Sequence, residues 1–202
     1  MDLARRVADA VLYEGYVLYP YRASAAKNQG RFQFGVVIPR AVSERLPWTS
    51  DGVGGAEEGW FQRTECLLEA PGPFRVEATV RFLQAQARTV QVLRDGRYRR
   101  TSRLEVGDTV LVPWDEAVEH EVQVSLTCDG DLGAEQLRFE LPGGRATEPV
   151  ADPEGRPVGR LVRRRWRLRG RTSLRAERVP GPYGLVRLGM RTENLTPWSG
   201  PT

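Results

Sequence analysis

The sequence predicts a mainly β protein: an antiparallel β-sandwich, immunoglobulin-like or jelly-roll-like, with a short N-terminal helix. Apolar and polar residues alternate along most of the chain, and clusters of Gly, Pro and Asp separate the alternating runs. Only one stretch has the period of an amphipathic helix. A closed β-barrel is the structural alternative. The 202 residues are enough for one large β domain.

The N-terminal helix is expected within residues 1–15. Leu3, Val7 and Val11 recur at every fourth position, which places them on one face of a helix. Gly15 can end the helix, because glycine readily adopts the left-handed conformation that closes many helices.

Residues 16–202 are expected to form a single β-sandwich domain. The alternating runs that predict its strands are residues 31–38, 60–69, 76–92, 118–126, 137–141, 162–169 and 186–191. The dipeptide Asp95-Gly96 predicts a tight hairpin. Near Phe82 the alternation slips by one residue, so a bulge or a tight connection is expected there if both halves of the run are buried.

Two segments are expected to be mobile loops. Residues 47–59 and residues 142–157 are rich in turn-forming residues and have no regular alternation. The second segment could be mistaken for a domain linker. The strands that follow it are too few to form an independent core, so it is expected to lie within one domain.

Composition predicts a soluble, cytoplasmic protein. Hydrophobic residues make up 40% and charged residues 28% of the chain, and no apolar run is long enough for a signal peptide core or a membrane span. The net charge is +4, and Lys27 is the only lysine. This preference for arginine is typical of a GC-rich genome and does not by itself indicate phosphate binding.

Motifs for catalysis, metal binding and cofactor binding are missing from the sequence, and we predict neither a metal nor a cofactor. His120, the only histidine, is expected to be structural because no local motif supplies partners. Cys66 and Cys128 are expected to be buried free thiols. The adjacent Asp115 and Glu116 are expected to be solvated loop residues.

Arginines alternate along one predicted strand, at positions 163, 165, 167 and 169. Such a ladder could follow a phosphate backbone, but few aromatic residues accompany it. Glu119 and Glu121 offer opposite charges for cross-strand pairs. We therefore expect a salt-bridged outer face and regard nucleic acid binding as disfavoured.

The candidate binding segment is residues 16–31, where aromatic rings and hydrogen-bond donors are dense. Its nominated residues are Tyr16, Tyr19, Tyr21, Arg22, Lys27, Asn28 and Arg31. Tyrosine and arginine are enriched at interface hot spots, so the segment suits a protein partner. In the alternative structural interpretation, the tyrosines pack the helix onto the sandwich and residues 27–29 form a turn or cap.

Three further interpretations remain open. In an enzyme, Lys27 would act as base or nucleophile and Tyr19 or Tyr21 as acid, provided that burial or nearby cations lower the lysine pKa. In a protein that binds a small ligand or carbohydrate, Trp48 and Trp60 would stack on a sugar ring. Exposed strand edges could also pair two copies of the chain into a homo-oligomer.

Three segments of the sequence carry a resemblance to known sequences: VLYEGYVLYPYRASAAKNQGRFQFGVVIPR, WFQRTECLLE and LVRLGMRTENLTPW. In these segments the sequence resembles a family of uncharacterised bacterial proteins found near actinobacterial-type NiFe-hydrogenase genes. It implies a hydrogenase-associated accessory role in assembly, stabilisation or electron-transfer coupling, with a hydrogenase subunit as partner. The family offers no established catalytic residues to carry over, so the nominated residues are the polar and aromatic members of the matching segment. Our hypothesis is a protein that is not an enzyme.

Overall fold

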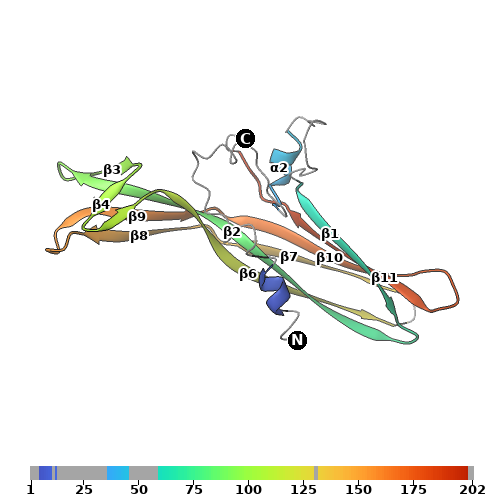
Figure 1. The fold of residues 1–202 in the computed structure, drawn as a ribbon. Helices are drawn as coiled ribbons and strands as arrows, with labels where there is room; N and C mark the ends of the chain where they lie inside the picture. Colours follow the sequence, from blue (N-terminus) through green and yellow to red (C-terminus); the bar gives the residue numbers. More distant parts are fainter. Residues whose placement is uncertain (1–4, 11, 13–35, 46–58, 130–131, 200–202) are drawn as a thin grey trace, which may run out of the picture. The chain divides into compact units, whose positions relative to one another are not determined.

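A computed structural model describes residues 5–10, 12, 36–45, 59–129 and 132–199 of the protein (Figure 1). These residues are mainly β, and the prediction of an antiparallel sandwich with a short N-terminal helix is confirmed. Residues 5–10 and 12 are helical, and a second short helix, α2, spans Arg40–Ser43.

The described residues group into two compact units. Unit 1 draws on the segments Met1–Arg81, Glu121–Glu140 and Arg169–Thr202, and unit 2 on Phe82–His120 and Leu141–Leu168. Two long strands, β2 (Phe74–Arg94) and β6 (Trp114–Cys128), contribute residues to both units.

Unit 1 contains a four-stranded sheet in the order β1 (Phe61–Glu69), β11 (Leu185–Asn194), β10 (Leu168–Arg178) and β7 (Ala134–Leu141) (Figure 1). The β1–β11 and β10–β11 pairs are antiparallel, and β1 forms one edge of the sheet. The strands predicted over 60–69, 137–141 and 186–191 are therefore confirmed.

The core of unit 1 joins this sheet to β6. Its buried residues are Ala70, Val124, Leu126, Cys128, Leu174, Ala176 and Val186, and the side chains from β2 that pack against them are Phe74, Val76 and Ala78. Burial of each large aliphatic side chain stabilises the fold by about 1.5–3 kcal/mol. Cys128 is buried as predicted. The prediction that Cys66 is buried is wrong, because Cys66 lies exposed on the edge strand β1.

Unit 2 contains the strand order β3 (Arg97–Thr101), β2, β9 (Pro157–Arg165) and β8 (Gly144–Ala151), and β6 also pairs with β2. A small hairpin of β4 (Leu104–Val106) and β5 (Thr109–Leu111) contributes Leu104 to a core with Val90 and Leu161. Glycine is needed at position 159, because a Cβ atom there would lie 2.6 Å from Leu104 Cδ2 and closer still to the Gln91 carbonyl oxygen.

The predicted Asp95-Gly96 hairpin is confirmed. Arg94 pairs with Arg97 across the turn, and Asp95 and Gly96 have φ values of 50° and 70°. Positive φ at both central residues is the requirement of the type I′ turn that joins twisted strands.

The predicted tight connection near Phe82 is wrong, because β2 continues through this residue. Even-numbered positions stay the most buried ones beyond it, with Gln84 4% and Val90 0% exposed. The apolar alternation fails because polar residues, among them Gln84 and Gln86, occupy those positions. Inward-pointing polar side chains therefore produced the apparent slip.

Two further sequence predictions need correction. Residues 142–157 are not a continuous loop, because Gly144–Ala151 forms β8. This strand is exposed except at Val150 and carries Pro149, as an edge strand can, so it shows no apolar alternation. The run over 162–169 is also interrupted: β9 ends at Arg165 and β10 begins at Leu168. The Trp166 carbonyl between them accepts a hydrogen bond from Gln84 Nε2 at 2.7 Å.

Two predicted segments lie largely outside the described residues. Of the strand expected over 31–38, the described part contains one parallel β-bridge between Val37 and Gly59. Of the loop expected over 47–59, Gly59 alone is described.

Candidate functional site

The nominated binding residues lie outside the described part of the chain. They are Tyr16, Tyr19, Tyr21, Arg22, Lys27, Asn28 and Arg31, and Trp48 is outside it as well. The structure does describe residues before and after the segment 16–31, namely 5–10, 12 and 36–45.

The N-terminal flank is attached to unit 1 by ion pairs. Asp9 in the helix pairs with Arg81 on β2, whose side chain is only 12% exposed. Arg5 lies 3.8 Å from the carboxylate of Glu121 on β6, and Arg81 lies 3.9 Å from the same residue. The helix that precedes the segment is thus held against β2 and β6.

The C-terminal flank is attached to the same unit by hydrogen bonds. Ile38 N donates to the Gly59 carbonyl at 3.0 Å, and Asn194 Nδ2 donates to the Val37 carbonyl at 2.9 Å. Asn194 N also donates to the Trp60 carbonyl at 2.8 Å. Residues 37–38 therefore lie beside the start of β1 and the end of β11, so the described residues before and after the nominated segment both contact unit 1.

An aromatic–arginine cluster of Arg40, Trp60, Phe61 and Arg191 lies next to the C-terminal flank. The Trp60 and Phe61 ring centroids are 5.3 Å apart in an edge-to-face arrangement. Arg191 Cζ lies 3.8 Å from the Phe61 centroid and 5.1 Å from that of Trp60, and Arg40 Cζ lies 4.7 Å from that of Trp60. Such stacked cation–π contacts hold the guanidinium groups in defined positions while Phe61 stays 39% exposed.

Glu193 fixes the position of Arg191. Its side chain is 4% exposed, pairs with Arg171 and lies 3.1 Å from Arg191 Nε. Burial alone would raise the pKa of Glu193, but the hydrogen bonds and charges of Arg171 and Arg191 outweigh burial and lower the pKa below its ordinary value. The ionised carboxylate thus orients a guanidinium that stacks on the exposed ring of Phe61.

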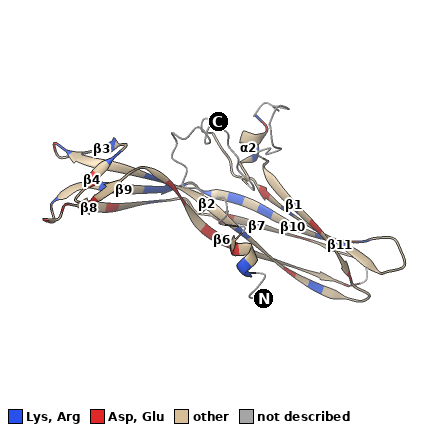
Figure 2. Cartoon of the chain, in the orientation of Figure 1, with Lys and Arg blue, Asp and Glu red and all other residues tan. Residues whose placement is uncertain are grey.

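The outer face of the unit 1 sheet carries alternating charges, and Figure 2 shows arginine positions recurring along β10. A hollow of about 300 Å³ on this face is lined by Arg63, Glu65, Ser173, Arg175, Glu177, Arg187, Gly189, Met190 and Arg191. Each of its arginines is ion-paired, for example Arg175 and Arg187 with Glu177 at 2.6 and 2.8 Å. The hollow is therefore a mixed-charge surface.

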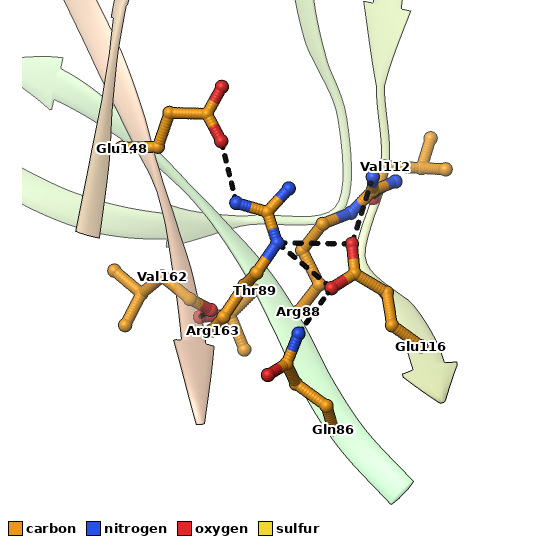
Figure 3. Close-up of polar contacts among 8 residues, drawn as sticks. All are labelled: Gln86, Arg88, Thr89, Val112, Glu116, Glu148, Val162 and Arg163. Carbon is orange, nitrogen blue, oxygen red and sulfur yellow. Dashed lines mark hydrogen bonds and ion pairs between the residues drawn. The ribbon is translucent and has the colours of Figure 1, made fainter. Parts of the chain in front are cut away.

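A second polar cluster lies in unit 2, around Glu116 on β6 (Figure 3). Its carboxylate accepts hydrogen bonds from Gln86 Nε2 at 2.7 Å and Arg163 Nε at 2.9 Å, and Arg88 lies 3.4 Å away. The prediction of a solvated loop residue is wrong, because the Glu116 side chain is 19% exposed within a strand. Hydrogen bonds from Arg163 to Glu148 and Glu116 raise the pKa of Arg163.

The alternating arginines at 163 and 169 are salt-bridged, as predicted. Arg169 pairs with Glu140 at 2.8 Å, and Arg163 pairs with the two carboxylates around it in Figure 3. Of the expected acidic partners, Glu121 instead pairs with Arg81 and Arg5. The positive charges of Arg163 and Arg169 are therefore offset by neighbouring carboxylates.

His120 forms local contacts of the kind expected for a structural histidine. Its Nε2 lies 2.9 Å from Gln84 Oε1, and its ring centroid is 5.7 Å from that of Phe82. Burial, followed by the charge of Arg165, lowers the pKa of His120 below 6.5. Both effects favour the neutral imidazole.

No protein-family model matches the sequence, and no curated protein or solved structure is significantly similar to it. Among the described residues, no group of three or more His, Cys, Asp and Glu side chains could hold a metal ion. No helix in the described ranges is long and apolar enough to cross a membrane.

We predict that Glu116→Gln lowers the free energy of unfolding by about 1–3 kcal/mol, because the half-buried arginines lose their carboxylate. Urea denaturation measures the change. The matched control is Glu105→Gln, whose carboxylate is 64% exposed and pairs with Arg103 at 2.7 Å. We expect the control to cost less than about 0.5 kcal/mol. Equal effects of the two substitutions would contradict a stabilising role for Glu116.

We also predict that the His120 imidazole titrates with a midpoint below 6.5. Because the folded pKa is lowered, the unfolded chain binds the proton first as pH falls. The stability that His120 contributes is therefore complete above about pH 6.5 and declines below it. NMR of the single imidazole gives the midpoint, and His120→Gln should remove this part of the pH dependence. A midpoint at or above 6.5 would refute the prediction.

Proposed function

We propose that the protein is a cytoplasmic, non-enzymatic accessory protein that binds a protein partner. The interface comprises the segment 16–31 and the adjoining aromatic–arginine cluster. The observation that carries this proposal is the cluster itself: Arg40, Trp60, Phe61 and Arg191 adjoin the C-terminal flank of the segment.

The chemistry of the cluster supports a protein partner. Tryptophan, tyrosine and arginine contribute most of the energy at many interfaces. In the cluster, Arg191 is already fixed by Glu193 and by two aromatic rings, so binding costs less side-chain entropy than it would for a free arginine. Described residues on both sides of segment 16–31, Asp9 and Val37, contact unit 1, which also carries the cluster.

The resemblance to proteins found near NiFe-hydrogenase genes suggests which partner to test first. We propose a hydrogenase subunit as the partner and assembly, stabilisation or electron-transfer coupling as the role. The carbohydrate-binding alternative requires an open face on Trp60, but Arg40 and Arg191 already stack on this ring. The enzyme alternative rests on Lys27, which lies outside the described residues.

Affinity capture of the tagged full chain from its native host tests this function. We expect the wild-type protein to capture NiFe-hydrogenase subunits, identified by mass spectrometry. Both Tyr21→Ala/Lys27→Ala and Arg40→Ala should reduce capture by about tenfold, because each removes side chains of the proposed interface. The matched control is Tyr183→Ala, which removes a tyrosine that is 73% exposed and lies on a turn.

Two results would contradict the proposal. One is wild-type capture that contains no hydrogenase subunit. The other is an equal loss of capture in the Tyr183→Ala control, which would mean that the effect does not depend on the proposed interface. Circular dichroism of each variant establishes that a loss of capture is not a loss of folding.

A further inference from the structure

Strand β1 has one side that no described residue pairs with. The strand order places β1 at the edge of the unit 1 sheet, with β11 as its neighbour among the described strands. Its residues Phe61–Glu69 are exposed except at Leu68. Two of them are large apolar side chains, Phe61 at 39% and Leu67 at 62% exposure. An edge of this kind is a ready template for another strand.

The pairing with β11 determines which backbone groups face this free edge. Asn194 N donates to the Trp60 carbonyl, and Ala70 N donates to the Gly184 carbonyl, so even-numbered residues direct their N–H and C=O groups toward β11. Because these directions alternate along an antiparallel strand, the odd-numbered residues direct theirs away from β11. The free donors and acceptors thus belong to the odd-numbered residues from Phe61 to Glu69.

The sequence of β1 is complementary to itself. If a second β1 strand pairs antiparallel with the first about a two-fold axis at Thr64, Phe61 lies opposite Leu67 and Arg63 lies opposite Glu65. The axis generates each pair twice, since a two-fold interface uses the same surface on both copies. Apolar side chains meet apolar ones, and opposite charges meet across the axis.

We propose that a second copy of this chain binds to the β1 edge in this register, so that the two unit 1 sheets continue into each other. The odd-numbered residues Phe61, Arg63, Glu65 and Leu67 become the hydrogen-bonded pairs of the new ladder. The ladder stops short of Gly59, because the Gly59 carbonyl already accepts a hydrogen bond from Ile38 N. The register between the two copies is thereby determined by the backbone hydrogen bonds, the apolar pair of Phe61 and Leu67, and the charge pair of Arg63 and Glu65.

Neighbouring registers fit less well. An axis at Arg63 places that arginine opposite its own copy, and an axis at Glu65 does the same for two carboxylates. Like charges directly opposite each other destabilise a strand pair. Registers with the axis between two residues would place free backbone groups of one strand opposite groups that already pair with β11. The axis at Thr64 is therefore the favoured one.

This self-association can be tested separately from the hydrogenase-binding proposal. Its interface is the edge of β1, whereas the proposed partner surface is residues 16–31 with the aromatic–arginine cluster. Phe61 is the one residue that both surfaces use, so the tests below leave Phe61 unchanged.

Cross-linking of the full chain tests the register. Across the new edge, Gln62 of one copy lies opposite Cys66 of the other in a non-hydrogen-bonded pair. The Cα separation in such a pair, about 4.5 Å, lies within the range for a disulfide. We expect a Gln62→Cys variant to form a covalent dimer on mild oxidation with diamide, seen on a non-reducing gel. Mass spectrometry should show position 62 linked to Cys66 of the other copy.

The controls separate this register from chance collision. The double variant Gln62→Cys/Cys66→Ser should not cross-link, because the two positions 62 are four residues apart along the ladder, about 13 Å. Wild type should not cross-link through Cys66 for the same reason. Cross-linking of the double variant as readily as the single one overturns the proposal. Efficient wild-type cross-linking through Cys66 overturns the register.

A charge exchange tests the interface without cysteine chemistry. Sedimentation equilibrium of wild type should show a species of twice the 22.7 kDa chain mass. Arg63→Glu should weaken dimerisation by about tenfold or more, because a carboxylate at position 63 then lies opposite Glu65 of the other copy. The two-fold axis repeats this repulsive pair at two places in the interface. Arg63→Glu/Glu65→Arg should restore it, since the pairs are again opposite in charge. A monomeric wild type, or failure of the double exchange to restore the dimer, overturns the proposal.

Discussion

The ladder between β1 and β11 is the constraint on which the surface chemistry of unit 1 depends. It pairs Phe61 with Glu193 at one end and Glu69 with Leu185 at the other. This register places Phe61 beside Arg191 and the buried Glu193, and it holds Trp60 where Asn194 can bind both the Trp60 and the Val37 carbonyls. It also directs alternate backbone groups of β1 outward. The proposed partner surface and the proposed self-association both follow from this one pairing.

Unit 2 depends on a different interaction, the pairing of half-buried arginines on β2 and β9 with carboxylates from β6 and β8. Arg88 lies opposite Arg163 in the β2–β9 ladder, which by itself would be a repulsive pair. Glu116 from β6 and Glu148 from β8 supply the opposing charges (Figure 3). A half-buried guanidinium is stable only when such partners satisfy it, so this part of the unit depends on these two glutamates.

The alternation of apolar residues was sufficient to predict strands that have one buried face. This applies to β6, where Val124 and Leu126 are buried, and to β11, where Val186 is buried. It failed for β8, whose exposed residues include Pro149, because an edge strand needs little apolar surface. It also failed near Phe82, since inward polar residues such as Gln84 find partners that are distant in sequence.

The surface beside the nominated segment could be predicted only in part. Trp60 and Arg191 lie in predicted strands, but they are more than a hundred residues apart in sequence. Their contact depends on the pairing of β1 with β11, which brings them together. The self-complementary order of charges in β1 is visible in the sequence. Its significance appears only when β1 is placed at a sheet edge, with its odd-numbered backbone groups facing outward.

Amide hydrogen exchange along β1, measured residue by residue at low and high protein concentration, shows whether a second copy pairs with this edge. We predict that Thr64 and Leu68 are protected by β11 at both concentrations. The amides of Arg63, Glu65 and Leu67 should exchange quickly in dilute solution and slow down as concentration rises, because the second copy then binds them. If exchange at these three residues does not change with concentration, two β1 edges do not pair.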